Sequence, residues 1–397
     1  MKTFVQYGAG NIGRGFIGEI FSNANYNILF IDVNMEVVNA LNNQQSYPIS
    51  IVSNKGTKEI IVNNVSGING IDTENVAIAI ANCSLMATAV GVNVLPKIVP
   101  NLIAGFRKRI EIGNQKPLNI IICENLIDAD KLLYKLITEQ LNEKEKEIFN
   151  KQVGLVEASI GRMVPIMTEE MKKENILRVC VESYCELPID KDAFKGEIPR
   201  VPHLFPFSPF QFYIKRKLYI HNMGHALTAY LGNLIGCEYI WQAIENPTIK
   251  IIVQRAMTES AIALSKKYNI PLQSILEHIE DLLLRFSNIA LGDTTQRVGK
   301  DIKRKLSAND RFVGAIKMCE RQNIAPIYIS IGIAAGLFFE NIIENGIDQT
   351  LHNLCDIKED KYIKPYYEQL EKEKNHITLL KMAETLKENE FKIKKII

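Results

Sequence analysis

Three polar residues in the second half of the chain have types and a spacing suited to acid–base chemistry. Lys217, Asn222 and His225 lie in the stretch KLYIHNMGHALTAYLG, residues 217–232. Apolar residues recur with helical spacing after Leu218, and Asn222 and His225, three positions apart, share one helix face. Lys217 lies near the expected helix start, so its long side chain can reach back over that face. A base, an amide and an imidazole would then surround one ligand.

Gly224, within the same stretch, removes a side chain where a ligand could approach closely. The alternative for this stretch is a helix entrance with a solvated lysine and a core histidine. The rest of the chain bears on this choice, beginning with its N-terminus.

A glycine-rich turn follows the first predicted strand, residues 3–7. The turn consists of Gly8, Ala9, Gly10, Asn11, Ile12 and Gly13. Because a helical segment comes next, this is a GxGxxG fingerprint in the position that a dinucleotide-binding fold requires. Gly8 would make the tight turn, Gly10 would admit the pyrophosphate, and Gly13 would let the helix pack on the strand.

The start of that helix, at Asn11 and Ile12, offers N–H groups and a partial positive charge to the phosphates. The next predicted strand, residues 27–31, ends in Asp32. A carboxylate there accepts hydrogen bonds from the adenosine ribose and repels a 2′-phosphate, so the sequence predicts NAD rather than NADP. The alternative is a glycine-rich turn that binds no ligand.

Two later strands also end in residues suited to ligand binding. One apolar strand leads into Val90 and Gly91, at a carboxyl end where open α/β sheets bind ligands. Another ends in Glu124 and Asn125, a carboxylate and an amide well placed to meet substrate or nicotinamide. For this pair the alternative is an N-cap of the following helix, since Asn is a good cap.

The segment 285–311 is basic, rich in hydroxyl groups and loop-like. Arg297, Lys300 and Arg304 are its candidates for binding a phosphorylated substrate through charge-assisted hydrogen bonds. The alternative is a solvated charged face. Three aspartates offer salt-bridge partners within the segment: Asp293, Asp301 and Asp310.

Composition limits the class of protein. The 397 residues are 47% hydrophobic and 23% charged, with a net charge of +2, which gives no global indication of nucleic-acid or acidic-lipid binding. No run approaches the ~20 apolar residues of a membrane span, and no secretory signal is visible. The seven cysteines form no CxxC pair, and the six histidines include no HExxH motif. We therefore expect reduced thiols, no metal site and a cytoplasmic protein.

The expected fold class is α/β, with an N-terminal Rossmann-type doubly wound domain over residues 1–195. A mostly α-helical, substrate-binding C-terminal domain is expected over 196–397, because four prolines within 199–209 mark a crossing. Residues 49–52 and 59–65 are expected as a strand hairpin within the first domain. The helices expected in the second domain are 218–235, 238–268, 271–286, 310–322, 325–344 and 376–394.

Taken together, these motifs resemble a known family. The opening YGAGNIGRGFIGEIF is similar to the N-terminal fingerprint of the mannitol-1-phosphate 5-dehydrogenases, which belong to the polyol-specific long-chain dehydrogenase/reductases. Lys217, Asn222 and His225 match the K-x4-N-x2-H pattern of that family. The stretches ATAVGVNVLPKIVP, ICENL and RFSNIALGDTTQRVGKDIKRKLSANDR also resemble its phosphate-polyol branch. The similarity runs from residue 3 to about residue 340.

The resemblance implies an NAD-dependent, metal-independent interconversion of mannitol 1-phosphate and fructose 6-phosphate. Lys217 would be the general base in oxidation and the general acid in reduction, provided that its pKa falls well below ~10.4. Asn222 would hold the developing alkoxide, and His225 would bind the reacting oxygen or a neighbouring hydroxyl. Asn125 would complete the oxyanion site, and Glu124 would relay the proton to solvent.

The partner implied is a small sugar or polyol phosphate, whose phosphate Arg297, Lys300 and Arg304 would bind; a monomer or homodimer is expected. One departure is Gly161, where the family usually has an aspartate, so a charge interaction near Arg162 is expected to be missing. Relatives with the same base pattern act on unphosphorylated mannitol or on hexuronates. A non-catalytic NAD-binding sensor is the alternative from another class.

Overall fold

The computed structural model describes residues 2–165, 167, 173–339, 351–352 and 355–372. The helix expected over 376–394 lies outside these residues. The chain divides into two compact units, Met1–Tyr213 and Ile214–Ile397. This division comes after the boundary expected at residue 195, because β10 (Leu187–Asp190) pairs in parallel with β11 (Leu204–Phe207) and ties the proline-rich segment to the first unit.

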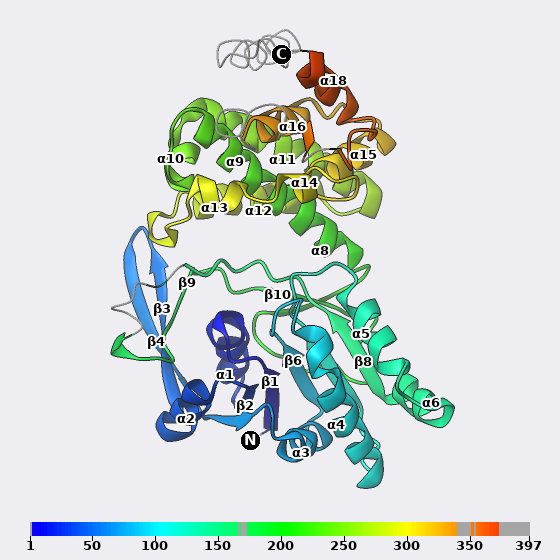
Figure 1. Cartoon of the computed structure of the whole chain (residues 1–397). Helices are drawn as coiled ribbons and strands as arrows, with labels where there is room; N and C mark the ends of the chain where they lie inside the picture. Colours follow the sequence, from blue (N-terminus) through cyan, green and yellow to red (C-terminus); the bar gives the residue numbers. More distant parts are fainter. Residues whose placement is uncertain (1, 166, 168–172, 340–350, 353–354, 373–397) are drawn as a thin grey trace. The chain divides into compact units, whose positions relative to one another are not determined.

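A six-stranded, all-parallel sheet forms the centre of the first unit (Figure 1). Its order, β5-β2-β1-β6-β7-β8, is the doubly wound order of a Rossmann fold. The predicted fold class is confirmed for this part of the chain. The strands are β1 (Lys2–Tyr7), β2 (Tyr26–Asp32), β5 (Val65–Asn69), β6 (Leu85–Thr88), β7 (Leu118–Ile122) and β8 (Val153–Glu157).

Helices supply an apolar layer on each face of this sheet. Successive residues of β1 point to opposite faces, so Phe4 and Val5 lie in two different core clusters. The connecting helices are a π-helical turn η1 (Gly13–Gly18), α1 (Glu19–Asn23), α2 (Met35–Gln44), α3 (Thr73–Asn82), η2 (Leu95–Ile98), α4 (Val99–Glu111), α5 (Ala129–Thr138) and α6 (Glu143–Gln152).

A smaller sheet, β4-β3-β9, is inserted after α2. β3 (Ser46–Ser53) and β4 (Gly56–Asn63) form the predicted antiparallel hairpin, and β9 (Val179–Val181) pairs with β3 in parallel. The prediction of one strand over 59–65 is wrong: Asn64 has φ of 58°, and the chain turns there out of the hairpin into β5. Asparagine tolerates this left-handed conformation better than most residues.

A buried ion pair joins the loop after β8 to the helix that follows the glycine-rich turn. Arg162 Nη1 donates to Glu19 Oε2 at 2.5 Å and to the carbonyl oxygen of Gly15 at 2.9 Å, and its Nε donates to the carbonyl of Glu182 at 3.0 Å. The expectation of a missing charge interaction near Arg162 is therefore wrong. Glu19, from another part of the chain, supplies the negative charge that Gly161 does not.

The π-helical turn η1 is held from outside by this contact and a second one. The Tyr47 hydroxyl, from β3, donates to the carbonyl oxygen of Arg14 at 2.8 Å. Gly15 is required because a Cβ there would lie 2.7 Å from Val179 Cγ1 in β9. The smaller sheet therefore packs directly against the backbone of the turn that begins the first helix.

The second unit is helical, as predicted, with α9 contacting α10, α11, α13 and α16. The helix expected from 218 begins earlier, with α8, and the helix expected over 238–268 is two helices. Asn246 ends the first, caps the second with its side chain, and is followed by Pro247 at the first helical position. The helices are α8 (Gln211–Arg216), a π-helical turn η3 (Lys217–Asn222), α9 (Met223–Leu234), α10 (Ile240–Glu245), α11 (Pro247–Tyr268), α12 (Leu272–Phe286), η4 (Ile289–Leu291), α13 (Thr295–Gly299), α14 (Ile302–Lys305), α15 (Val313–Arg321), α16 (Ile327–Phe339) and α18 (Lys364–Lys372).

We predict that Glu19→Gln lowers the free energy of unfolding by about 3 kcal/mol, because it leaves the buried guanidinium of Arg162 without a counter-charge. Urea denaturation measures the change. The matched control is Glu111→Gln, which breaks an exposed pair with Lys108 at 2.9 Å and should cost less than about 1 kcal/mol. Equal losses in the two variants would contradict the role given to the buried pair.

Candidate active site

The glycine-rich turn gives each of its three glycines a different environment. Gly8 has φ of +95°, and a Cβ there would lie 2.4 Å from the carbonyl oxygen of Ala89. A Cβ on Gly13 would lie 2.1 Å from the carbonyl oxygen of Gly8, so this glycine lets the helix pack on the turn. Gly10 differs, because a Cβ there would meet no atom within 4 Å. The backbone at Gly10 is therefore open to a ligand.

The residues at the start of the first helix are accessible as well. Asn11 is exposed and Ile12 is half-buried. Beside them, Asp32 at the end of β2 accepts hydrogen bonds from the N–H groups of Ala9 at 2.7 Å and Asn34 at 2.9 Å. The carboxylate of Asp32 thus lies against the glycine-rich turn, as a ribose contact would require.

The loop after β6 is held by a carboxylate from the neighbouring strand. Buried Glu124 accepts a hydrogen bond from the N–H of Val90 at 2.9 Å and another from the N–H of Gly91 at 2.8 Å. The structure therefore connects Glu124, for which the sequence analysis expected a proton relay, with Val90 and Gly91, which it expected to bind a ligand. Since each oxygen of Glu124 accepts a backbone N–H, its contacts fit positioning of the loop. Asn125, next in the chain, is exposed.

Lys217 and Asn222 lie at the two ends of the π-helical turn η3, in the middle of a continuous helical stretch. The expectation that Lys217 lies near a helix start is wrong. In an α-helix, five residues span about 1.4 turns, which would point the two side chains about 140° apart. In a π-helical turn the hydrogen bonds run from residue i to i+5, so five residues close roughly one turn. The π-helical turn thereby returns Lys217 and Asn222 to one side of the helix.

Lys217 is partly buried, and its environment makes its neutral amine more accessible than that of an exposed lysine. Burial, and then the positive charge of Arg311, lowers the pKa of Lys217 from its usual 10.5 to about 8. Arg311 is fixed in place, since its Nε donates to Asp310 at 2.9 Å and its Nη1 to the carbonyl oxygen of Asn222 at 3.3 Å. Arg311 is the last residue of the basic segment 285–311, and the sequence analysis gave it no role of its own.

His225 has an acidic partner that the sequence analysis did not assign to it. Its Nε2 lies 3.4 Å from Oδ2 of Asp293, and its ring stacks on Phe286 with centroids 4.9 Å apart. Burial alone would raise the pKa of Asp293, but the interactions with His225 and Arg297 outweigh it and lower this pKa below its usual 3.8. Asp293 therefore stays ionised and orients the imidazole.

The three predicted phosphate-binding cations lie on short helices or at their ends. Arg297 forms an ion pair with Asp293, and Arg304 lies 3.3 Å from Asp310 and 3.6 Å from Asp301. Lys300 is exposed at the end of α13. The salt bridges left open as an alternative are thus present for two of the three cations. The structure brings Arg297 to the His225–Asp293 pair.

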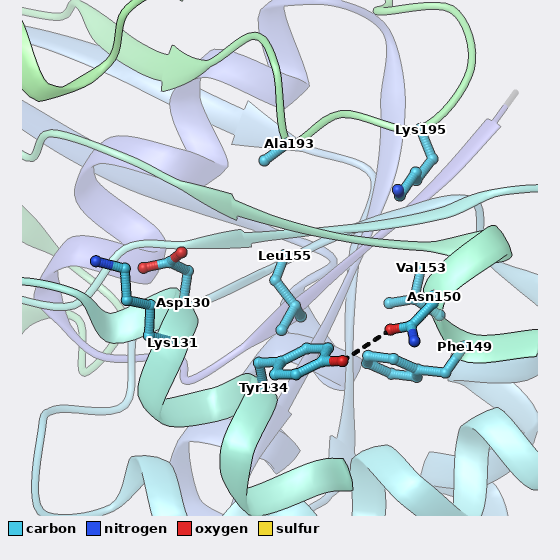
Figure 2. A pocket seen from close by; sticks show the side chains of 9 residues that line it. All are labelled: Asp130, Lys131, Tyr134, Phe149, Asn150, Val153, Leu155, Ala193 and Lys195. Carbon is cyan, nitrogen blue, oxygen red and sulfur yellow. Dashed lines mark hydrogen bonds between the residues drawn. The ribbon is translucent and has the colours of Figure 1, made fainter. Parts of the chain in front are cut away.

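A pocket of about 310 Å³ lies on the first unit, and Figure 2 shows the side chains that line it. In it, the Tyr134 hydroxyl donates to Asn150 Oδ1 at 3.1 Å. Its charges are mixed, with Asp130 beside Lys131 and Lys195. None of the predicted site residues lines this pocket, so it is separate from the residues considered above.

The described part of the chain contains no group of three or more His, Cys, Asp or Glu side chains arranged to hold a metal ion. None of its described helices has the length and apolar character that crossing a membrane would require.

Comparison with known protein families covers nearly the whole chain. Residues 2–203 match the model of the mannitol dehydrogenase Rossmann domain, and residues 210–396 match that of the mannitol dehydrogenase C-terminal domain. The chain belongs to the mannitol dehydrogenase family. This membership confirms the predicted family and, with it, the prediction of a dehydrogenase.

Curated members of the mannitol dehydrogenase family share about a third of the sequence. The chain is 35% identical to the mannitol-1-phosphate 5-dehydrogenase of Buchnera aphidicola subsp. Schizaphis graminum, over 89% of this chain and 94% of that protein. It is 36% identical to the mannitol-1-phosphate 5-dehydrogenase of Thermoanaerobacter pseudethanolicus, over 91% of this chain and 95% of that protein.

Solved structures of the mannitol dehydrogenase type share the fold. The mannitol 2-dehydrogenase of Pseudomonas fluorescens, in a ternary complex with NAD and D-mannitol, matches with a TM-score of 0.73 and 13% identity, over 98% of this chain and 94% of that one. A D-sorbitol dehydrogenase in substrate-free form matches with a TM-score of 0.71 and 14% identity, over 85% and 80%. At such identities the likeness concerns the fold alone.

We predict that Gly10→Ala and Gly13→Ala separate cofactor binding from folding. Gly10→Ala should leave the thermal midpoint unchanged but raise the Kd for NADH by roughly tenfold, because the added methyl group occupies space that only a ligand uses. Gly13→Ala should lower stability by about 1–3 kcal/mol, because its methyl group meets a backbone carbonyl. Fluorescence titration and thermal unfolding test both, and unchanged NADH affinity in Gly10→Ala would contradict the assignment.

Proposed function

We propose that this protein catalyses the NAD-dependent interconversion of D-mannitol 1-phosphate and D-fructose 6-phosphate. The observation that carries the proposal is the π-helical turn with Lys217 and Asn222 on one side, in a chain about 35% identical to proteins named mannitol-1-phosphate 5-dehydrogenase. Oxidation of a secondary alcohol needs a base for the hydroxyl proton and a donor for the developing negative charge. Lysine and asparagine provide these two groups.

NAD fits the glycine-rich turn, because Gly10 leaves its backbone open and the carboxylate of Asp32 lies beside it as an acceptor for ribose hydroxyls. The N–H groups near Asn11 and Ile12 suit its phosphates. When bound, NAD supplies the hydride acceptor for oxidation and, as NADH, the hydride donor for reduction. Glu124 fixes the loop at Val90 and Gly91. In this proposal, that loop makes a second contact with the cofactor.

Lys217 takes the proton from the substrate hydroxyl during oxidation and returns it during reduction. With a pKa of about 8, roughly a tenth of the side chains are neutral at pH 7. A lysine with the usual pKa of 10.5 would be neutral in well under about one molecule in a thousand. The shift therefore increases the supply of the competent base by more than about a hundredfold.

Asn222 donates to the substrate oxygen as negative charge develops on it, and His225 holds a neighbouring hydroxyl or the same oxygen. Asp293 keeps the imidazole of His225 oriented, since it lies 3.4 Å from Nε2. Asp293 and its ion pair with Arg297 are thus positioning groups in this proposal. Asn125 remains the candidate for a further donor to the substrate oxygen.

The substrate phosphate is assigned to the basic segment. All three candidate cations are exposed, and two of them, Arg304 and Arg297, already contact aspartates. An arginine can retain one carboxylate partner and still present other N–H groups to a phosphate. This assignment separates the proposed substrate from unphosphorylated mannitol, fructose and hexuronates.

The test of the proposed function is NADH oxidation at 340 nm with fructose 6-phosphate and, separately, fructose, in EDTA without added metal. We predict activity with the phosphate ester and little with fructose. Lys217→Met should reduce turnover by at least about a hundredfold while NADH binding stays unchanged. Activity on fructose alone would reject the phosphorylated substrate, and near wild-type turnover of Lys217→Met would reject the lysine mechanism.

The pH dependence tests the role of Arg311. Since neutral lysine is the base, kcat/KM for polyol phosphate oxidation should rise with pH through about 8, and kcat/KM for reduction should fall over the same range. Arg311→Met removes a positive charge that lowers the pKa of Lys217, so the rise should move to higher pH. Lys250→Met, which removes an exposed charge elsewhere, is the control. A midpoint that does not move in Arg311→Met contradicts the electrostatic role.

A further inference from the structure

The second unit contains a pocket whose charged lining is entirely basic. Its volume is about 250 Å³, and four cations reach it from three helices: Lys215 on α8, Lys267 on α11, and Lys317 and Arg321 on α15. Asn309 and Gln322 add amide groups, and no carboxylate is among the described residues that line the pocket. It therefore differs from the pocket of Figure 2, where an acid lies among the cations.

The described residues neutralise only a small part of this positive charge. Lys317 donates to the carbonyl oxygen of Ala308 at 3.0 Å and to Asp360 at 3.4 Å. Lys215 donates to the hydroxyl of Tyr219 at 3.0 Å, a neutral partner. Within the described residues, three of the four cations form no ion pair: Lys215, Lys267 and Arg321.

Helix dipoles offer another reason for cations here, since Lys267 and Arg321 lie in the last turns of their helices. The cations of the pocket also repel one of their own number, Lys267. Burial, and then the charges of Lys215 and Arg321, lowers the pKa of Lys267. Lys215 and Arg321 therefore lie close enough to Lys267 to destabilise its charged form, and an anion among the three would relieve this repulsion.

We propose that this pocket is a binding site for a small phosphorylated molecule, separate from the residues assigned to catalysis. Phosphate oxygens accept charge-assisted hydrogen bonds from lysine and arginine, and the amides of Asn309 and Gln322 can donate to a short attached chain. The volume suits a phosphate or a phosphate ester of a few carbons. Lys217, Asn222 and His225 do not line it.

The separation from the catalytic side chains follows from the helix itself. Lys215 and Lys217 are two positions apart, and residues with that spacing do not face the same side of a helix. Tyr219 packs tightly in the pocket wall, because a Cβ on Gly314 would lie 2.7 Å from its hydroxyl oxygen. The proposed anion site therefore shares a helix with the proposed catalytic lysine but uses a different face.

Isothermal titration of the NADH-saturated protein tests the proposal, because the cofactor then fills the glycine-rich turn. The basic segment assigned to the substrate phosphate stays open, so the pocket variants below distinguish the two sites. Inorganic phosphate and glycerol 3-phosphate are titrated separately at constant ionic strength. We expect saturable binding that Lys267→Ala/Arg321→Ala weakens by about tenfold or more. Tighter binding of glycerol 3-phosphate identifies an ester as the ligand, and equal or tighter binding of inorganic phosphate identifies the free ion.

The matched control is Lys58→Ala/Lys250→Ala, which also removes two exposed positive charges but lies outside the pocket. Its affinity should equal that of the unmodified protein. Equal weakening in both double variants, or in neither, overturns the proposal. If the pocket variant does not fold, Arg321→Gln, which changes one exposed side chain, gives the same test with the same criteria.

Discussion

The hydrogen bonds of the buried Arg162 guanidinium are the interactions on which the part of the first unit around the glycine-rich turn depends. Arg162 neutralises Glu19 and donates hydrogen bonds to two carbonyl oxygens. One belongs to Gly15 in the π-helical turn η1, and the other to Glu182, directly after β9. Because a buried charge without its partner is costly, these groups keep one arrangement. The glycine-rich turn lies at the start of the helix that these hydrogen bonds fix, so they also help to hold the open backbone at Gly10 in place.

The second unit has a similar arrangement at the residues proposed for catalysis. A π-helical turn there also has a carbonyl oxygen, that of Asn222, which accepts a hydrogen bond from an arginine distant in sequence, Arg311. π-helical turns are rare and are frequent at functional sites, and each leaves backbone groups that need partners from elsewhere. In this unit the partner also acts electrostatically, since the charge of Arg311 lowers the pKa of Lys217.

The sequence predicts those parts of the molecule that have a local signature. The strand, the three glycines and Asp32 lie within the first 32 residues, and their spacing alone indicates a dinucleotide fold. Asparagine at position 64 gives no comparable signal that one apolar run is split between two sheets. The contacts of Arg162 with Glu19 and of His225 with Asp293 join residues far apart in sequence, so only the folded chain reveals them. The π-helical turn at Lys217 is likewise invisible to a search for helical periodicity.

The π-helical turn also accounts for the five-residue spacing of Lys217 and Asn222. Removing one residue between them would leave four steps, which an ordinary α-helix accommodates with regular hydrogen bonding. Those four steps turn by about 400°, close to the single turn that five steps make in the π-helical turn, so the two side chains would still share one side of the helix. The π-helical turn thus amounts to one residue inserted into an α-helical stretch, and the residues before and after it keep nearly the relative orientation that they would have without the insertion.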